Sequence, residues 1–257
     1  MIIAVAGGKG SPGATALAAL IASTWPHVDQ PRVLMEADPE GGVLAARWHH
    51  SLGVTHDPGL LSLAAARDGS ALERVRQHGQ PVRDGLELVA GPPGGAQAEA
   101  CLRELGDGAA EALRDAPVVC IVDCGRLHPT SSALPLARAA EHLLLVTRPR
   151  LDEVVGLAPA AERLLVAGLT PTLVCIGTAP FAPAEVAEHV ALPLRAVIAD
   201  DPVALATLFA QGPAARRVVR SRLRKSVTAL VATLTPASEA AAGVAADQAG
   251  NDRVRVR

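Results

Sequence analysis

The stretch that decides the fold is residues 2–23, IIAVAGGKGSPGATALAALIAS. Residues 2–6 are apolar and rich in β-branched side chains, which is typical of a buried strand in a parallel sheet. Residues 15–23 repeat their large apolar side chains at helical spacing. A glycine-rich loop joins the two segments, and backbone N–H groups at the start of a helix bind anions. The stretch therefore predicts a strand, an anion-binding loop and a helix.

Two nucleotide-binding motifs fit this loop. From Gly8, the letters GKGSPGAT fill the P-loop pattern G-x-x-x-x-G-K-[ST], with Ala14 in place of the lysine. The same letters spell G-x-G-x-x-G, the dinucleotide fingerprint, with Glu36 where a ribose-binding acid is expected. The chain has 22 arginines and two lysines, and one lysine, Lys9, lies in this loop. A compact ammonium suits phosphate, which favours the P-loop. The candidate phosphate-binding residues are Gly8, Lys9, Gly10, Ser11, Pro12, Gly13, Ala14 and Thr15.

The composition excludes several classes of protein. With 257 residues and 49% hydrophobic content, the chain can bury one large α/β core. Only 2% of residues are aromatic, which argues against a stacking surface for single-stranded nucleic acid. The four cysteines form no C-x-x-C pair, so we expect reduced core thiols rather than a zinc site. We see no signal peptide and no apolar run of membrane-spanning length, and therefore expect a cytoplasmic protein.

Acidic residues follow two further apolar runs. Residues 33–38, VLMEAD, predict a strand that ends in acids, and residues 117–123, PVVCIVD, predict a strand that ends in Asp123. An apolar strand that runs into Asp is the Walker B pattern, whose carboxylate holds Mg²⁺ beside the P-loop hydroxyl. Ligands bind outside the carboxyl ends of parallel strands, where these acids should lie.

The rest of the chain alternates strands with helices. We expect strands at 86–90, 142–147, 172–176 and 194–198, and helices at 97–114, 151–167, 183–189 and 202–210. Residues 43–85 are expected to be mostly helical. This order predicts a doubly wound, mostly parallel sheet flanked by helices, a three-layer P-loop NTPase-like α/β/α fold in one domain, residues 1–235.

The end of the chain is basic. A helix over about 214–234 carries Val219, Leu223, Val227 and Leu230 at helical spacing. Two interpretations stay open: the helix packs its apolar stripe on the sheet, or it contacts an anionic membrane or DNA. The arginines that would make that contact include Arg216, Arg217, Arg220 and Arg224. Residues 236–257 are expected to be disordered.

Together these motifs resemble the MinD/ParA family of deviant Walker ATPases, over roughly residues 1–212. Residues 9–15, KGSPGAT, are similar to the family loop K-G-G-x-G-K-[ST]. Residues 36–41, EADPEG, are similar to the family's D-x-D-P-x-G, and Asp123-Cys124-Gly125 matches the end of its Walker B strand. The dinucleotide alternative explains neither the Asp38-Pro39 pair nor the strand that ends in Asp123.

The resemblance implies a homodimer that holds ATP and Mg²⁺ between its subunits and recognises a protein partner. Lys9 would reach the partner's phosphates and Asp38 would orient the attacking water, while Thr15, Asp38 and Asp123 would form the metal site. The implied function is an ATP-dependent dimerisation switch in cellular positioning or partitioning. Ala14 departs from the family lysine, so we expect weak or no ATP hydrolysis. A non-hydrolysing scaffold for a secretion, pilus or division apparatus remains an alternative, as does an NAD(P)-dependent enzyme.

Overall fold

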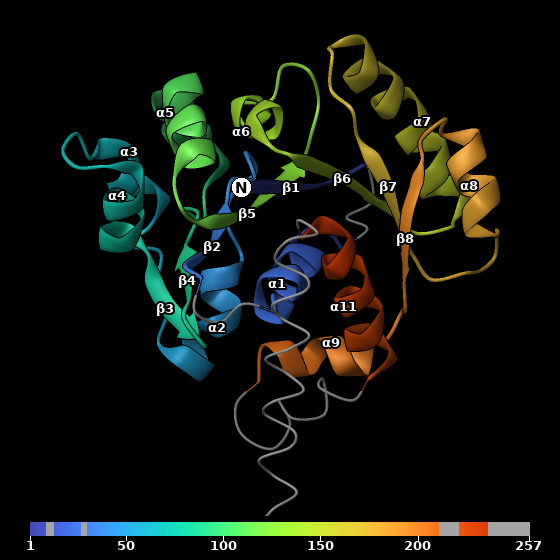
Figure 1. Cartoon of the computed structure of the whole chain (residues 1–257), viewed down its shortest axis with the longest axis horizontal. Coiled ribbons are helices and arrows are strands. Elements are labelled where there is room, and N and C mark those ends of the chain that lie inside the picture. Colours follow the sequence, from blue (N-terminus) through green and yellow to red (C-terminus); the bar gives the residue numbers. More distant parts are fainter. Residues whose placement is uncertain (9–12, 27–29, 211–220, 236–257) are drawn as a thin grey trace, which may run out of the picture.

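A computed structural model describes residues 1–8, 13–26, 30–210 and 221–235 (Figure 1). The predictions made for Lys9, Gly10, Ser11 and Pro12 lie outside the described residues, as do those for Arg216, Arg217 and Arg220 and for the tail 236–257.

Within these ranges, eight strands form one sheet in the order β3-β4-β2-β5-β1-β6-β7-β8. Only the β3–β4 pair is antiparallel; the other neighbours are parallel. The predicted doubly wound, mostly parallel sheet is therefore confirmed. The strands are β1 (Ile2–Gly7), β2 (Arg32–Glu36), β3 (Gln80–Arg83), β4 (Leu86–Val89), β5 (Val119–Arg126), β6 (His142–Thr147), β7 (Thr172–Ile176) and β8 (Leu194–Ile198).

Helices cover both faces of the sheet, giving the three layers expected (Figure 1). One face packs against α1 (Ala14–Thr24), α2 (Leu44–Leu52), α9 (Pro202–Leu208) and α11 (Arg222–Leu234). The other face packs against α3 (Leu60–Ala65), α4 (Ala71–His78), α5 (Gly95–Asp115), α6 (Leu134–Ala139), α7 (Leu151–Val166) and α8 (Pro183–His189).

The core is aliphatic, and its centre is the β1–α1 unit. β1 is buried along its whole length between β5 and β6. In α1 the alanines at 18, 19 and 22 are fully buried, and these small side chains let the helix pack closely between the sheet and α11. The four cysteines are buried and free, as predicted. This packing holds the start of α1 rigidly at one edge of the sheet.

Two elements differ from the sequence prediction. Residues 43–85 contain the edge strand β3, whose sequence QPVR has no apolar run; an edge strand tolerates proline because one side of its backbone needs no partner. The predicted helix over about 214–234 is interrupted at Ser221, the N-cap from which the described helix begins at Arg222. Residues 214–220 of that prediction lie outside the described residues. Leu223, Val227 and Leu230 of the helix's apolar stripe are buried against α1 and β8, as the packing interpretation expects; Val219 lies outside the described residues.

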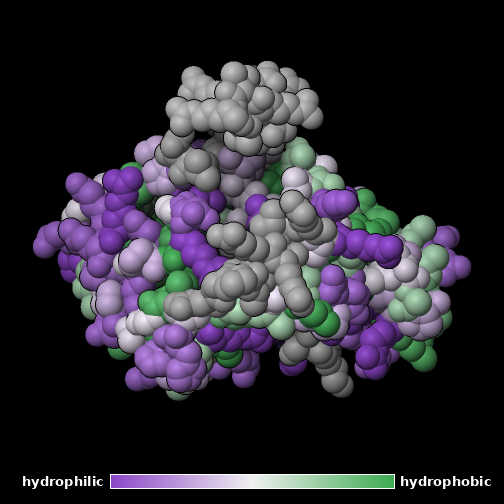
Figure 2. All heavy atoms as spheres, turned by 90° about the horizontal axis from the view of Figure 1, so that it is seen from below, coloured by the Kyte–Doolittle hydropathy of each residue, from purple (hydrophilic) through white to green (hydrophobic). Residues whose placement is uncertain are grey.

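The visible outer surface is mostly polar. Seen from the side of α9, hydrophilic side chains cover most of the coloured surface and hydrophobic ones form small separate patches (Figure 2). None of the helices that the structure describes is both long enough and apolar enough to span a bilayer.

Candidate functional site

A cavity of about 420 Å³ lies at the carboxyl ends of β1, β2 and β5. These three strands are neighbours and parallel, so the loops that follow them meet at one edge of the sheet. The cavity is lined by glycines of the first loop, by the start of α1, and by residues after β2 and in the last part of β5. It therefore lies where ligands bind in open parallel sheets.

Asp123 lies at the bottom of this cavity and is 1% exposed. Its carboxylate accepts hydrogen bonds from the Thr15 hydroxyl and from the Gly125 N–H, the latter at 3.2 Å. Burial raises the pKa of Asp123 to about 7, although both hydrogen bonds lower it. The Thr15 hydroxyl and the Asp123 carboxylate, which the sequence analysis expects to lie side by side, are thus in contact.

Asp38 approaches the same cavity from the turn after β2. Its carboxylate accepts a hydrogen bond from the Glu40 N–H at 2.9 Å. It lies directly against Gly125: a Cβ atom added there would lie 2.0 Å from the Asp38 Cγ, and the φ of Gly125 is +56°. Burial raises the pKa of Asp38, while the nearby Arg126 lowers it. Glycine at position 125 therefore allows the two acid-bearing loops to touch.

Glu36 has a different role from the one that the dinucleotide motif assigns to it. Its side chain is 1% exposed and accepts backbone N–H bonds from Val43 and Leu44, both at 2.7 Å, and from Gly91 at 3.1 Å. Burial raises the pKa of Glu36, and these three bonds lower it. The carboxylate joins the start of α2 to the loop after β4, so it is not available to a ribose. The dinucleotide interpretation therefore lacks the acid that would bind the ribose.

The described part of the glycine loop faces the cavity. Gly8, Gly13, Ala14 and Thr15 all line it. Gly13 is the N-cap of α1 with a φ of +107°, and no side chain among the described residues caps the helix. The first backbone N–H groups of a helix have no partner within the helix and can bind an anion. Ala14 is 7% exposed, so at this position the cavity wall is a methyl group instead of an ammonium.

The donors in the cavity fit a hard cation. Thr15, Asp38 and Asp123 offer one hydroxyl and two carboxylates, and Mg²⁺ prefers oxygen ligands, completing its shell with water and phosphate. The mutual repulsion of Asp38 and Asp123 also raises the pKa of Asp123, an effect that a cation would reverse. No cluster of three or more His, Cys, Asp or Glu suited to a metal occurs among the described residues.

Sequence patterns did not predict that two cationic side chains line this cavity. Arg47 reaches it from α2 and Arg126 from the end of β5. The helical pattern around Arg47 gave no signal for a site. Arg126 lies three residues after Asp123, and regular alternation would place the two on opposite faces of the sheet.

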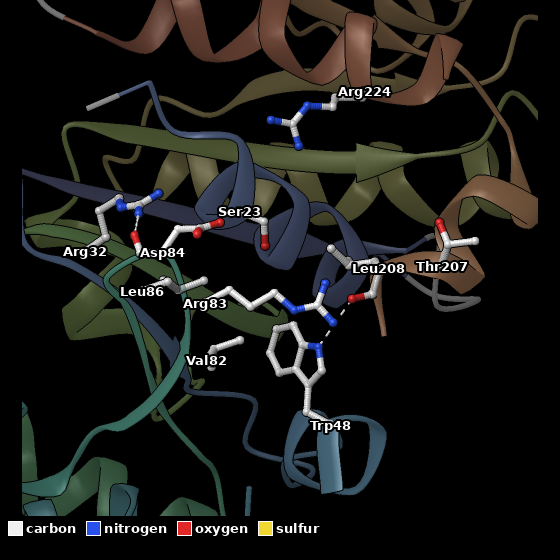
Figure 3. A pocket seen from close by; sticks show the side chains of 10 residues that line it. All are labelled: Ser23, Arg32, Trp48, Val82, Arg83, Asp84, Leu86, Thr207, Leu208 and Arg224. Atoms are coloured by element: carbon white, nitrogen blue, oxygen red, sulfur yellow. Dashed lines mark hydrogen bonds between the residues drawn. The ribbon is translucent and has the colours of Figure 1, made fainter. Parts of the chain in front are cut away.

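A second cavity of about 150 Å³ lies at the opposite end of α1 (Figure 3). Arg32, Arg83 and Arg224 line it, but two of them are held by backbone. Arg32 donates to the carbonyl oxygen of Ala22, in the last turn of α1, at 3.3 Å and to that of Asp84. Arg83 donates to the carbonyl oxygen of Ala210, just after α9.

These two guanidinium groups therefore compensate helix C-termini, which carry partial negative charge. Arg224 of α11 is half-buried at the same cavity (Figure 3). The second cavity is consistent with a structural role.

Comparison with solved structures identifies the fold. No protein-family model and no curated protein sequence matches the chain. The chain is similar to a ParA family ATPase from Chlorobium tepidum TLS, with a TM-score of 0.73 and 17% identity over 91% of this chain and 98% of that one. It is similar to the septum site-determining protein MinD from Pyrococcus horikoshii OT3, solved with Mg-ADP, with a TM-score of 0.72 and 18% identity over 93% of this chain and 98% of that one. The cell division ATPase MinD of Pyrococcus furiosus gives a TM-score of 0.71 and 21% identity over 90% of this chain and 96% of that one. The fold implied by the sequence motifs is confirmed.

Proposed function

We propose that this chain, which has the fold of the ParA and MinD ATPases, binds Mg-ATP and forms a homodimer when ATP is bound. This dimerisation would act as a switch in cellular positioning or partitioning. The observation that carries the proposal is the meeting of Thr15, Asp38 and Asp123 in one cavity at the N-terminus of α1. A glycine loop, a hydroxyl and two acids at one sheet edge are the parts that nucleotide phosphates and Mg²⁺ require.

Each residue has a stated role in this proposal. The backbone N–H groups at the start of α1 hold phosphate oxygens. Thr15 and Asp123 hold Mg²⁺, which when bound offsets phosphate charge. Asp38 would complete the metal site with these two residues and would orient the attacking water. Lys9, outside the described residues, reaches the phosphates of the partner subunit.

Hydrolysis is expected to be slow or absent. Phosphoryl transfer depends on positioned positive charge, and Ala14 removes the ammonium that a P-loop provides. The same observation favours the second candidate, a non-hydrolysing scaffold for a secretion, pilus or division apparatus. In Ala14→Lys, a large gain of turnover would show that the native site is degenerate and would favour the scaffold. An unchanged rate would show that Ala14 is not what limits hydrolysis.

The direct test is calorimetric titration of Mg-ATP into the intact protein, with light scattering in ATP and in ADP to measure its mass. We expect saturable binding, an increase in mass with ATP, and weaker binding in Lys9→Ala and Asp123→Asn. Asp152→Asn is the matched control, because Asp152 is an exposed acid at the start of α7. No saturable binding by the native chain would refute the proposal.

The proposal includes a cytoplasmic location, an unidentified protein partner and contact with an anionic membrane or DNA through Arg216, Arg217, Arg220 and Arg224. Of these, the structure describes Arg224, which is half-buried. We expect salt-sensitive binding to anionic vesicles or to duplex DNA that is lost when the arginines at 216, 217 and 220 are replaced. Binding that survives these replacements would contradict this contact.

A further inference from the structure

The cavity lacks the positive charge that a P-loop lysine at position 14 would bring to a bound phosphate. Ala14 occupies the first position of α1, where its side chain is a methyl group at the cavity wall. Against this, Asp38, Glu40 and Asp123 bring three acids to the same space. The described cations that line the cavity are Arg47 and Arg126. Among the described residues, these two arginines are the side chains that could compensate the charge of a polyphosphate bound there.

The backbone places Arg126 beside the glycine loop. Arg126 is the last residue of β5 and pairs in the sheet with Gly7, where the loop begins. The pairing of β1 with β5 shifts register between Val5 and Gly7, and Gly125 has a positive φ at the shift. This bulge explains why Asp123 and Arg126, three residues apart, line the same cavity.

Arg126 is also the cation whose guanidinium has no direct ring contact, hydrogen bond or ion pair among the described residues. The Arg47 guanidinium lies 5.0 Å from the centroid of the Phe209 ring, a cation–π contact. Arg126 is exposed, and its guanidinium makes no hydrogen bond or ion pair with any other described residue; its electrostatic neighbour is Asp38. Arg126 also borders an adjoining hollow of about 310 Å³, so the side chain has open space on both sides.

We propose that Arg126, at the end of β5, supplies the phosphate-binding positive charge that a P-loop lysine at position 14 of α1 would supply. This inference rests on the proposed nucleotide-binding function. A guanidinium is suited to the role because its planar array of donors binds phosphate oxygens in pairs. Its position makes Arg126 a binding residue of the polyphosphate, separate from the metal ligands Thr15 and Asp123.

The test is equilibrium titration of the intact chain with Mg-ATP and, as a base-free probe, inorganic tripolyphosphate with Mg²⁺. We expect Arg126→Gln to weaken both by about tenfold or more, and Arg126→Lys by less, because it keeps the charge. Arg103→Gln is the matched control: Arg103 is an exposed arginine beside the adjoining hollow, paired with Glu99, and its loss should change affinity by about twofold or less. In the Ala14→Lys background the effect of Arg126→Gln should shrink to about threefold or less, because the new ammonium replaces it.

The outcomes separate this inference from the function on which it rests. Native binding that survives Arg126→Gln unchanged would overturn the inference and leave the proposed function standing. A larger loss in Arg47→Gln than in Arg126→Gln would assign the charge to α2 and also overturn it. Equal effects of Arg126→Gln with and without Ala14→Lys would show that the two positions do not substitute for each other, and would overturn the inference. Absence of binding by the native chain would overturn both proposals. Thermal midpoints equal to that of the native chain would show that the variants are folded.

Discussion

Replacement of the buried acid Asp123 by asparagine should change how the stability of this protein depends on pH. The carboxylate is 1% exposed and its pKa is about 7, because burial disfavours its charged form. An asparagine at 123 keeps an oxygen that can accept hydrogen bonds from the Thr15 hydroxyl and the Gly125 N–H, but carries no charge. The variant therefore isolates the effect of burying that charge.

The size of the effect follows from the pKa. In the unfolded chain the group has its ordinary value of 3.8, so between about pH 4 and about pH 7 the folded state binds more protons than the unfolded state. Stability linked to this proton is present at low pH and is lost as the pH rises to about 7. The difference between 3.8 and about 7 corresponds to about 4 kcal/mol of the free energy of unfolding. Above about pH 7 both states are ionised and the difference levels off.

The assay is urea denaturation of the native chain and Asp123→Asn at intervals from about pH 4.5 to about pH 8.5, without Mg²⁺ or nucleotide. Relative to the native chain, the variant should gain stability with rising pH, by as much as about 4 kcal/mol near pH 8. Asp152→Asn, which removes an exposed acid, should follow the native curve within about 0.5 kcal/mol.

Parallel curves for the native chain and Asp123→Asn would refute the reasoning, because they would mean that Asp123 is ionised at the same pH folded and unfolded. A variant that loses stability as the pH rises would reverse the predicted sign. Either result would remove the argument that this cavity holds an acid that favours a bound cation.

Three further predictions concern the surrounding structure. Glu36→Ala should lower the free energy of unfolding, measured in urea, by about 3 kcal/mol or more, because it leaves three backbone N–H groups unpaired. Glu36→Gln keeps an acceptor and should lose clearly less; equal losses in the two variants would contradict the structural role of these hydrogen bonds. Gly125→Ala should lower the free energy of unfolding by about 1–3 kcal/mol, since the residue has a positive φ and the new Cβ would collide with Asp38. It should also weaken Mg-ATP binding in calorimetry, and native-like affinity would argue against the close contact of Gly125 with Asp38. Ala14→Lys should strengthen Mg-ATP binding by about tenfold in a fluorescence titration, and an unchanged affinity would place position 14 away from the phosphates.

Much of the fold was predictable from local patterns. Short apolar runs alternate with helical spacing, and this alternation alone indicated a parallel sheet between two helical layers. The strand β3 was missed because an edge strand needs neither an apolar run nor a complete set of backbone partners, so QPVR resembles a loop. The boundary at Ser221 was missed because arginines continue the helical pattern across it.

By itself, the sequence determined which chemical groups stand at the ends of strands: the glycine loop, Thr15, Asp38 and Asp123. These signals are local, because strand periodicity and the polarity of parallel strands place their carboxyl ends at one edge. Tertiary structure alone decided the roles of the remaining groups. Glu36 and Asp38 are two residues apart, yet Glu36 is bound by N–H groups from α2 and from Gly91, 55 residues away, while Asp38 lies against Gly125. Arg126 joins the cavity because a bulge in the β1–β5 pairing turns the end of β5. Such contacts depend on how distant segments pack, and no local pattern records them.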